Sequence, residues 1–116
     1  MVIEQRMVGG VAVLDLKGKF ALGDGDGLLK DKVNSLVQQG VKEIALNLGE
    51  LSYMDSAGLG ELIAAHSTTT RSGGRITIFN LTKRVSELLV ITKVLTVFDV
   101  FETEQEALKS FPAAAR

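Results

Sequence analysis

The spacing of hydrophobic residues changes from segment to segment along this chain, and it predicts the order of strands and helices. The segments 2–8 and 11–16 are rich in strand-forming residues, and Gly9-Gly10 between them is typical of a hairpin turn. Three further strands are predicted at residues 44–48, 76–78 and 97–101. We expect the first of these to be interrupted at Gly49-Glu50.

Four helices are predicted between and after these strands. They begin near Leu28, at Asp55-Ser56, after the capping residue Thr82 and at Thr103. Their apolar faces carry Leu29, Val33, Leu36 and Val37, then Leu59, Leu62 and Ile63, then Val85, Leu88 and Leu89. Gly40 is expected to close the first helix. The last one opens with a T-x-x-E capping box and should run to residue 111, followed by a frayed tail at 112–116.

Strands that alternate with single helices predict an α/β fold. Such connections are right-handed crossovers between parallel strands, and here an antiparallel hairpin precedes them. We therefore expect a mixed sheet of about five strands with an N-terminal hairpin and about four helices. No repeat or linker divides the 116 residues, so the chain should form one domain over residues 1–116.

Composition and charge exclude several classes of function. Thirteen Lys and Arg residues against fourteen Asp and Glu residues give a net charge of -1, so no general attraction to nucleic acid or to an acidic membrane is expected. The absence of cysteine excludes disulfides, cysteine-ligated zinc and thiol catalysis. The first residues do not form a secretion signal, and no apolar stretch reaches the ~18 residues of a membrane span. These features predict a cytoplasmic protein without membrane insertion.

The start of the second predicted helix is the most informative segment for function. Ser56 could simply cap the helix, since Asp and Ser are both preferred there. However, Gly58 and Gly60 each cost the helix about 1 kcal/mol relative to alanine, which predicts a bare surface that another backbone or molecule can approach closely. A helix N-terminus also tolerates negative charge, so phosphorylation of Ser56 could alter the surface without disturbing the fold.

The run 47–60, NLGELSYMDSAGLG, closely resembles the phosphorylation segment of anti-sigma factor antagonists, which are STAS domain proteins. The resemblance covers nearly the whole chain and implies that the helices lie mostly on one face of the sheet. It implies that Ser56 is the phosphoacceptor and Asp55 its neighbour at the helix start. It further implies that the unphosphorylated form binds an anti-sigma factor that is also a serine kinase and thereby frees the sigma factor. Phosphorylation would release the antagonist.

The bare start of this helix and the adjacent loop give the expected partner-binding residues. They are Asp55, Ser56, Ala57, Gly58, Leu59 and Gly60, together with Asp24 and Asp26 of the glycine-rich loop 18–27. Relatives usually carry an Asp in a G-x-[LIV]-D pattern, whereas this chain has Ala21 at that place. Either Asp24 or Asp26 of the loop supplies the missing carboxylate, which we favour, or the partner kinase differs from the type that the family usually has. Neither a cofactor nor a direct nucleic-acid contact is expected, and a weak homodimer is allowed.

Other kinds of site fit the sequence less well. The segment 23–27 fails the spacing of a calcium-binding EF-hand, so no metal site is expected. His66 lies ten residues after Ser56, roughly 15 Å along a helix, which disfavours a hydrolase that uses this serine. We therefore expect packing from His66 and no enzymatic activity. Lys83, Arg84 and Lys93 should lie on a solvated helix face, from which they can meet an acidic partner.

A second function remains compatible with the sequence. STAS-like domains also serve as accessory subunits of membrane lipid-transport complexes. The genes beside this one, a kinase and a sigma factor or a transporter operon, would distinguish the two functions.

Overall fold

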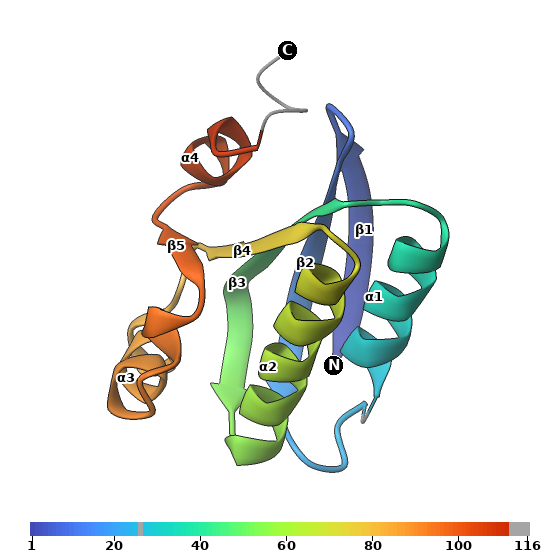
Figure 1. Cartoon of the computed structure of the whole chain (residues 1–116). Coiled ribbons are helices and arrows are strands. Elements are labelled where there is room, and N and C mark those ends of the chain that lie inside the picture. The colour runs from blue at the N-terminus through green and yellow to red at the C-terminus, as the bar shows by residue number, and fades with distance from the viewer. Residues whose placement is uncertain (26, 112–116) are drawn as a thin grey trace.

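A five-stranded sheet forms the centre of the structure, a computed structural model that describes residues 1–25 and 27–111 (Figure 1). The strands are β1 (Val2–Val8), β2 (Val11–Phe20), β3 (Glu43–Met54), β4 (Arg75–Phe79) and β5 (Asp99–Phe101), and they lie in this order across the sheet. β1 pairs antiparallel with β2, and every later pair is parallel. The predicted mixed α/β sheet with an N-terminal hairpin is therefore confirmed.

The hairpin turn follows from the two glycines. Gly9 and Gly10 have φ values of 57° and 87°, and positive φ at both central residues defines the turn that matches the twist of a two-residue hairpin. Val8 and Val11 are the pair next to this turn. The turn thus sets the register of β1 on β2.

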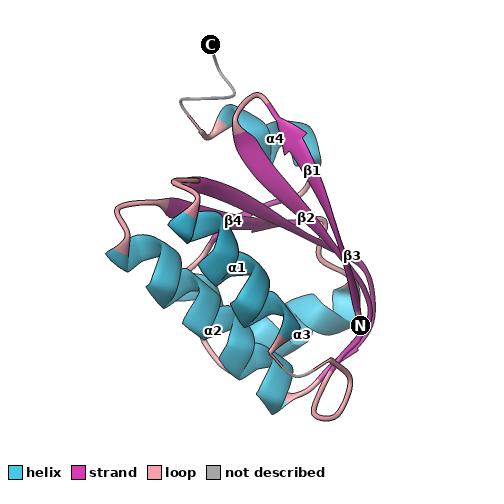
Figure 2. Cartoon of the chain, turned by 90° about the vertical axis from the view of Figure 1, so that its right-hand side faces the viewer, coloured by secondary structure: helices cyan, strands magenta, loops and turns pink. Residues whose placement is uncertain are grey.

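Three helices cover one face of the sheet, and a short fourth helix covers the other (Figure 2). The first three are α1 (Leu28–Gln38), α2 (Ser56–Arg71) and α3 (Lys83–Ile91), and the fourth is α4 (Glu104–Lys109). The larger core lies beneath α1, α2 and α3, whereas Ala107 of α4 and Phe111 after it pack with Val11 and Val13 of β2. Because both faces are covered, residues 11–16 are buried without interruption.

The expected interruption of β3 at Gly49-Glu50 is wrong. β3 continues to Met54 because its pairing with β2 continues to Phe20, with two shifts of register on the way. Gly49 serves a close approach instead, since a β-carbon there would lie 2.1 Å from Nδ2 of Asn80. The loop predicted from Gly18 consequently begins only after Phe20.

Three smaller expectations also need correction. The last strand is only Asp99–Phe101, because a 3-10 helix (Val94–Thr96) comes shortly before it. α4 ends at Lys109 and not at Phe111, and the tail 112–116 lies outside the described residues. Ile63 is 39% exposed and does not share the buried face of α2.

Candidate functional site

The carboxyl ends of β2 and β3 lie side by side, since Phe20 pairs with Met54 at the ends of these parallel strands. The loop after β2 and the start of α2 both lie at this edge of the sheet (Figure 1). In open α/β sheets, this is the edge at which functional residues usually gather. The topology therefore brings the residues predicted at 55–60 next to the loop after β2, which carries Ala21 and Asp24.

Asp55 connects these two segments. Its Oδ1 accepts hydrogen bonds from the backbone N–H groups of Ala57 and Gly58, both at 3.0 Å, and its Oδ2 accepts one from the N–H of Leu22 at 3.1 Å. Hydrogen bonds from Gly58, Leu22 and Ala57 stabilise the charged carboxylate and lower the pKa of Asp55. A single ionised side chain thus caps α2 and holds the loop that follows β2.

Ser56 is the first residue of α2 and is exposed. The interpretation of Ser56 as the helix cap is wrong, because Asp55 occupies that position and makes the capping bonds. Within the described part of the chain, the Ser56 hydroxyl has no hydrogen-bond partner. The hydroxyl is therefore accessible at a helix N-terminus and is not needed to hold the helix.

The two glycines of this helix differ in their surroundings. Gly58 is buried, and a β-carbon on it would lie 2.0 Å from the carbonyl oxygen of Phe20. The interpretation that Gly58 admits a partner is therefore wrong, because the backbone that approaches it belongs to β2 of the same chain. Gly60 is exposed with nothing within 4 Å of its β-position, whereas Leu59 is buried. Of the six residues predicted at 55–60 to bind a partner, Asp55, Ser56, Ala57 and Gly60 are at least partly exposed.

A depression of about 530 Å³ opens between the loop after β2, the end of β3 and the start of α3. We call it the site depression, and it is lined by Lys19, Ala21, Leu22, Asp24, Ser52, Tyr53, Asp55 and Arg84. Asp24 and Asp55 thus share one depression with Ala21, and the N–H of Asp24 donates to the carbonyl of Ala21 at 3.0 Å. The expectation for Asp26 falls outside the described residues.

Sequence reasoning missed Lys19, Leu22 and Tyr53 as residues of this depression. Lys19 and Tyr53 are paired at the ends of β2 and β3. The alternation of residues along each strand does not reveal this neighbourhood unless the register between the two strands is known. Arg84 was expected on a solvated face of the third helix, and it is exposed there, but it also reaches the depression.

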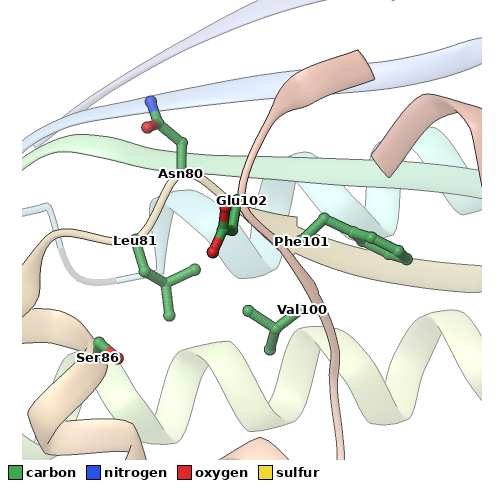
Figure 3. A pocket seen from close by; sticks show the side chains of 6 residues that line it. All are labelled: Asn80, Leu81, Ser86, Val100, Phe101 and Glu102. Carbon is green, nitrogen blue, oxygen red and sulfur yellow. The ribbon is translucent and has the colours of Figure 1, made fainter. Parts of the chain in front are cut away.

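A second depression of about 430 Å³ lies where β4 and β5 end (Figure 3). Leu81, Val100 and the carboxylate of Glu102 border its open space. Asn80 also lines it, but its amide donates to Oδ1 of Asn47 at 3.2 Å and points toward the neighbouring strands. No residue that the structure describes lines both depressions.

His66 has the packing role that the sequence predicts. Its ring lies 5.0 Å from that of Phe98, edge to face.

In the described ranges, 1–25 and 27–111, no three His, Cys, Asp or Glu side chains are grouped as metal ligands. None of the described helices is long and apolar enough to cross a membrane.

Comparison with known proteins identifies the relatives of this chain. The model of the STAS domain family matches residues 3–107. The anti-sigma-B factor antagonist of Bacillus subtilis is 32% identical over 73 residues, which cover 63% of this chain and 66% of the relative. That of Listeria monocytogenes is 30% identical over 75% of this chain and 80% of the relative.

Solved structures show the same fold. The anti-sigma factor antagonist SpoIIAA in its unphosphorylated form is 24% identical with a TM-score of 0.72, over 94% of this chain and 96% of SpoIIAA. Its phosphorylated form, from Bacillus, is 22% identical with the same TM-score of 0.72, over 94% and 98% of the two chains.

Proposed function

This chain belongs to the STAS domain family, and we propose that it is an anti-sigma factor antagonist that acts in the cytoplasm by binding and not by catalysis. In its unphosphorylated form it binds an anti-sigma factor that is also a serine kinase, and this binding frees the sigma factor. The kinase then phosphorylates Ser56, and the phosphorylated antagonist is released.

The position of Ser56 is the observation that carries this proposal. Its side chain is exposed at the first residue of α2, while Asp55 makes the hydrogen bonds that cap the helix. A kinase can therefore modify the hydroxyl without removing a bond that holds α2.

A phosphate on Ser56 would change the surface more than the fold. It adds between one and two negative charges at neutral pH, and the dipole of a helix N-terminus favours a negative charge there. The new charge would lie directly beside the site depression, because Asp55 lines its wall. A partner that docks on this surface would meet a different charge after phosphorylation, and this would weaken its binding.

The relatives support this role. The Bacillus subtilis and Listeria monocytogenes proteins are anti-sigma-B factor antagonists. SpoIIAA occurs in an unphosphorylated and a phosphorylated form on the same fold. The first observation favours the role of an antagonist, and the second favours a phosphorylation switch, over the other functions that the sequence left open.

The proposal is tested with purified chain, ATP and each anti-sigma factor kinase encoded in the source genome. Peptide mapping by mass spectrometry should place phosphate on Ser56, and Ser56→Ala should bind the same kinase but remain unmodified. Phosphate found mainly on Ser35, Ser52 or Thr68–Thr70 would contradict the assignment of the residue. No binding and no phosphorylation by any of these kinases would contradict the proposed function.

A further inference from the structure

Two basic side chains that form no ion pair with any described residue line the site depression. Lys19 comes from the end of β2 and Arg84 from the first turn of α3, and both are exposed. Among the residues that the structure describes, neither forms an ion pair or a side-chain hydrogen bond. Arg6 and Arg75, in contrast, are each paired with a carboxylate. The depression therefore holds two cations whose charge is not neutralised by a contact.

The described acidic residues of the same depression form no ion pair with these cations. Both carboxylate oxygens of Asp55 accept hydrogen bonds from backbone N–H groups of Leu22, Ala57 and Gly58. Asp24 forms no ion pair with either cation in the described chain. An acid that enters the depression from another molecule would consequently find both basic groups available.

Apolar surface lies next to these charges. Leu22 is 73% exposed and Tyr53, the one tyrosine of the chain, is 41% exposed, and both line the depression. Tyrosine and arginine are among the residues that most often dominate binding energy in protein interfaces. The depression thus combines an aromatic and an aliphatic anchor with two free cations.

We propose that the site depression receives an acidic side chain of the anti-sigma factor kinase between Lys19 and Arg84, with an apolar residue of the kinase against Leu22 and Tyr53. This inference rests on the proposed function and identifies the contact surface that serves it. Among the described charged groups of the depression that have no side-chain contact, the cations Lys19 and Arg84 outnumber the one carboxylate of Asp24, so the occupant should carry negative charge. It should be apolar beside that charge because Leu22 and Tyr53 are exposed.

The depression also explains how Ser56 could control this contact. Ser56 follows Asp55 in the chain, and Asp55 lines the depression, so a phosphate on Ser56 adds negative charge next to it. The phosphate would repel the acidic side chain of the kinase and compete with it for Lys19 and Arg84. Both effects weaken the complex without any movement of the fold.

The test uses the intact chain and, as the probe, the anti-sigma factor kinase that gives the most phosphate on Ser56 in the experiment above. Association and dissociation rate constants are measured for the parent, Lys19→Glu, Arg84→Glu and Tyr53→Ala. Lys30→Glu and Lys83→Glu are matched controls, because these exposed cations lie outside the depression, on α1 and on α3, and change the net charge equally. Each rate is measured at ~50 mM and ~500 mM NaCl, because salt screens exposed charges.

We expect Lys19→Glu and Arg84→Glu to lower the association rate constant by about tenfold at low salt, and much less at high salt. Tyr53→Ala should raise the dissociation rate constant by about tenfold at both salt concentrations. Equal effects of Arg84→Glu and Lys83→Glu, in a parent that binds and is phosphorylated, would overturn this inference and leave the proposed function standing. If Lys19→Glu, Arg84→Glu and Tyr53→Ala abolished self-association of the chain but left kinase binding unchanged, the depression would be a homodimer surface and the inference would be overturned. A parent that binds no kinase would overturn both proposals.

Discussion

The carbonyl oxygen of Phe20 lies 2.0 Å from the position that a β-carbon on Gly58 would occupy. This contact joins the end of β2 to the first turn of α2. The same carbonyl accepts a hydrogen bond from the N–H of Asp55 at 3.3 Å, so the two segments that form the candidate site are held together here. The site geometry therefore depends on the absence of a side chain at residue 58.

Gly58→Ala should lower the free energy of unfolding by about 1–3 kcal/mol, because the added methyl group forces backbone apart. Gly60→Ala is the matched control, since its β-position is open and alanine favours a helix by up to about 1 kcal/mol. Urea denaturation of both variants measures the two changes. Similar midpoints for the two variants would show that the contact with Phe20 is not tight.

Asp55→Ala should lower the urea midpoint, because three backbone N–H groups lose their acceptor. Ser56→Ala should change the free energy of unfolding by less than about 0.5 kcal/mol, because its hydroxyl makes no capping bond. If Ser56→Ala destabilised the chain as much as Asp55→Ala, the assignment of Asp55 as the cap would be contradicted. The same comparison separates a structural role of residue 56 from its role as phosphoacceptor.

Local patterns predicted much of this fold, and tertiary contacts decided what they missed. The glycine pair at 9–10 and the capping threonines Thr82 and Thr103 act through neighbours in sequence, and their elements are found where expected. Gly49 and Gly58, in contrast, are explained by Asn80 and Phe20, which lie about thirty or more residues away in the chain. A glycine that admits a distant segment of its own chain cannot be told from one that admits a partner by sequence spacing alone.

Part of the candidate site was also predictable from local sequence, and part of it depends on tertiary contacts. The motif located the helix start, and its resemblance to relatives identified Ser56 as the residue to test. The cations Lys19 and Arg84 could not be assigned to one surface, because they come from β2 and α3 and meet only through the sheet order.

A further prediction concerns Asp15, which lies outside the candidate site and is only 9% exposed. It accepts hydrogen bonds from Nε of Arg6 at 2.7 Å and from Nδ2 of Asn47 at 2.8 Å, and Arg6 also pairs with Glu104 of α4. Asp15→Asn should lower the free energy of unfolding by about 1–3 kcal/mol, because a charged, partly buried acceptor is lost. Asp99→Asn is the control, since its pair with Arg75 is exposed and contributes only about 0–1 kcal/mol.

The stability contributed by Asp15 should also depend on pH. The hydrogen bond from Arg6 is the main cause of the lowered pKa of this carboxyl group in the folded chain. Because the folded pKa is below the unfolded value, the contribution is present above pH ~4 and is lost as pH falls through the folded pKa. Between pH ~6 and ~2, the free energy of unfolding should therefore fall less steeply with decreasing pH in Asp15→Asn than in the parent. An equal pH dependence of the free energy of unfolding in the two proteins would show that the ionised form of Asp15 does not stabilise the fold.

The last prediction tests the contact between Gly49 and Asn80 through a double-mutant cycle. Asn80 has a positive φ of 61°, and its amide occupies the space in which a side chain at residue 49 would lie. Gly49→Ala should therefore cost about 1–3 kcal/mol in the parent, because the methyl group meets that amide. In the Asn80→Gly background the amide is gone, and glycine accepts the positive φ without strain.

We therefore expect Gly49→Ala to cost at least about 1 kcal/mol less in Asn80→Gly than in the parent, a coupling typical of residues in direct contact. The backbone oxygen of Asn80 lies 3.2 Å from the same β-position, so part of the cost should remain. Thermal or urea unfolding of the four proteins in the cycle gives the coupling. Additive costs would mean that the amide of Asn80 is free to move away, and that the continuity of β3 through Gly49 needs another explanation.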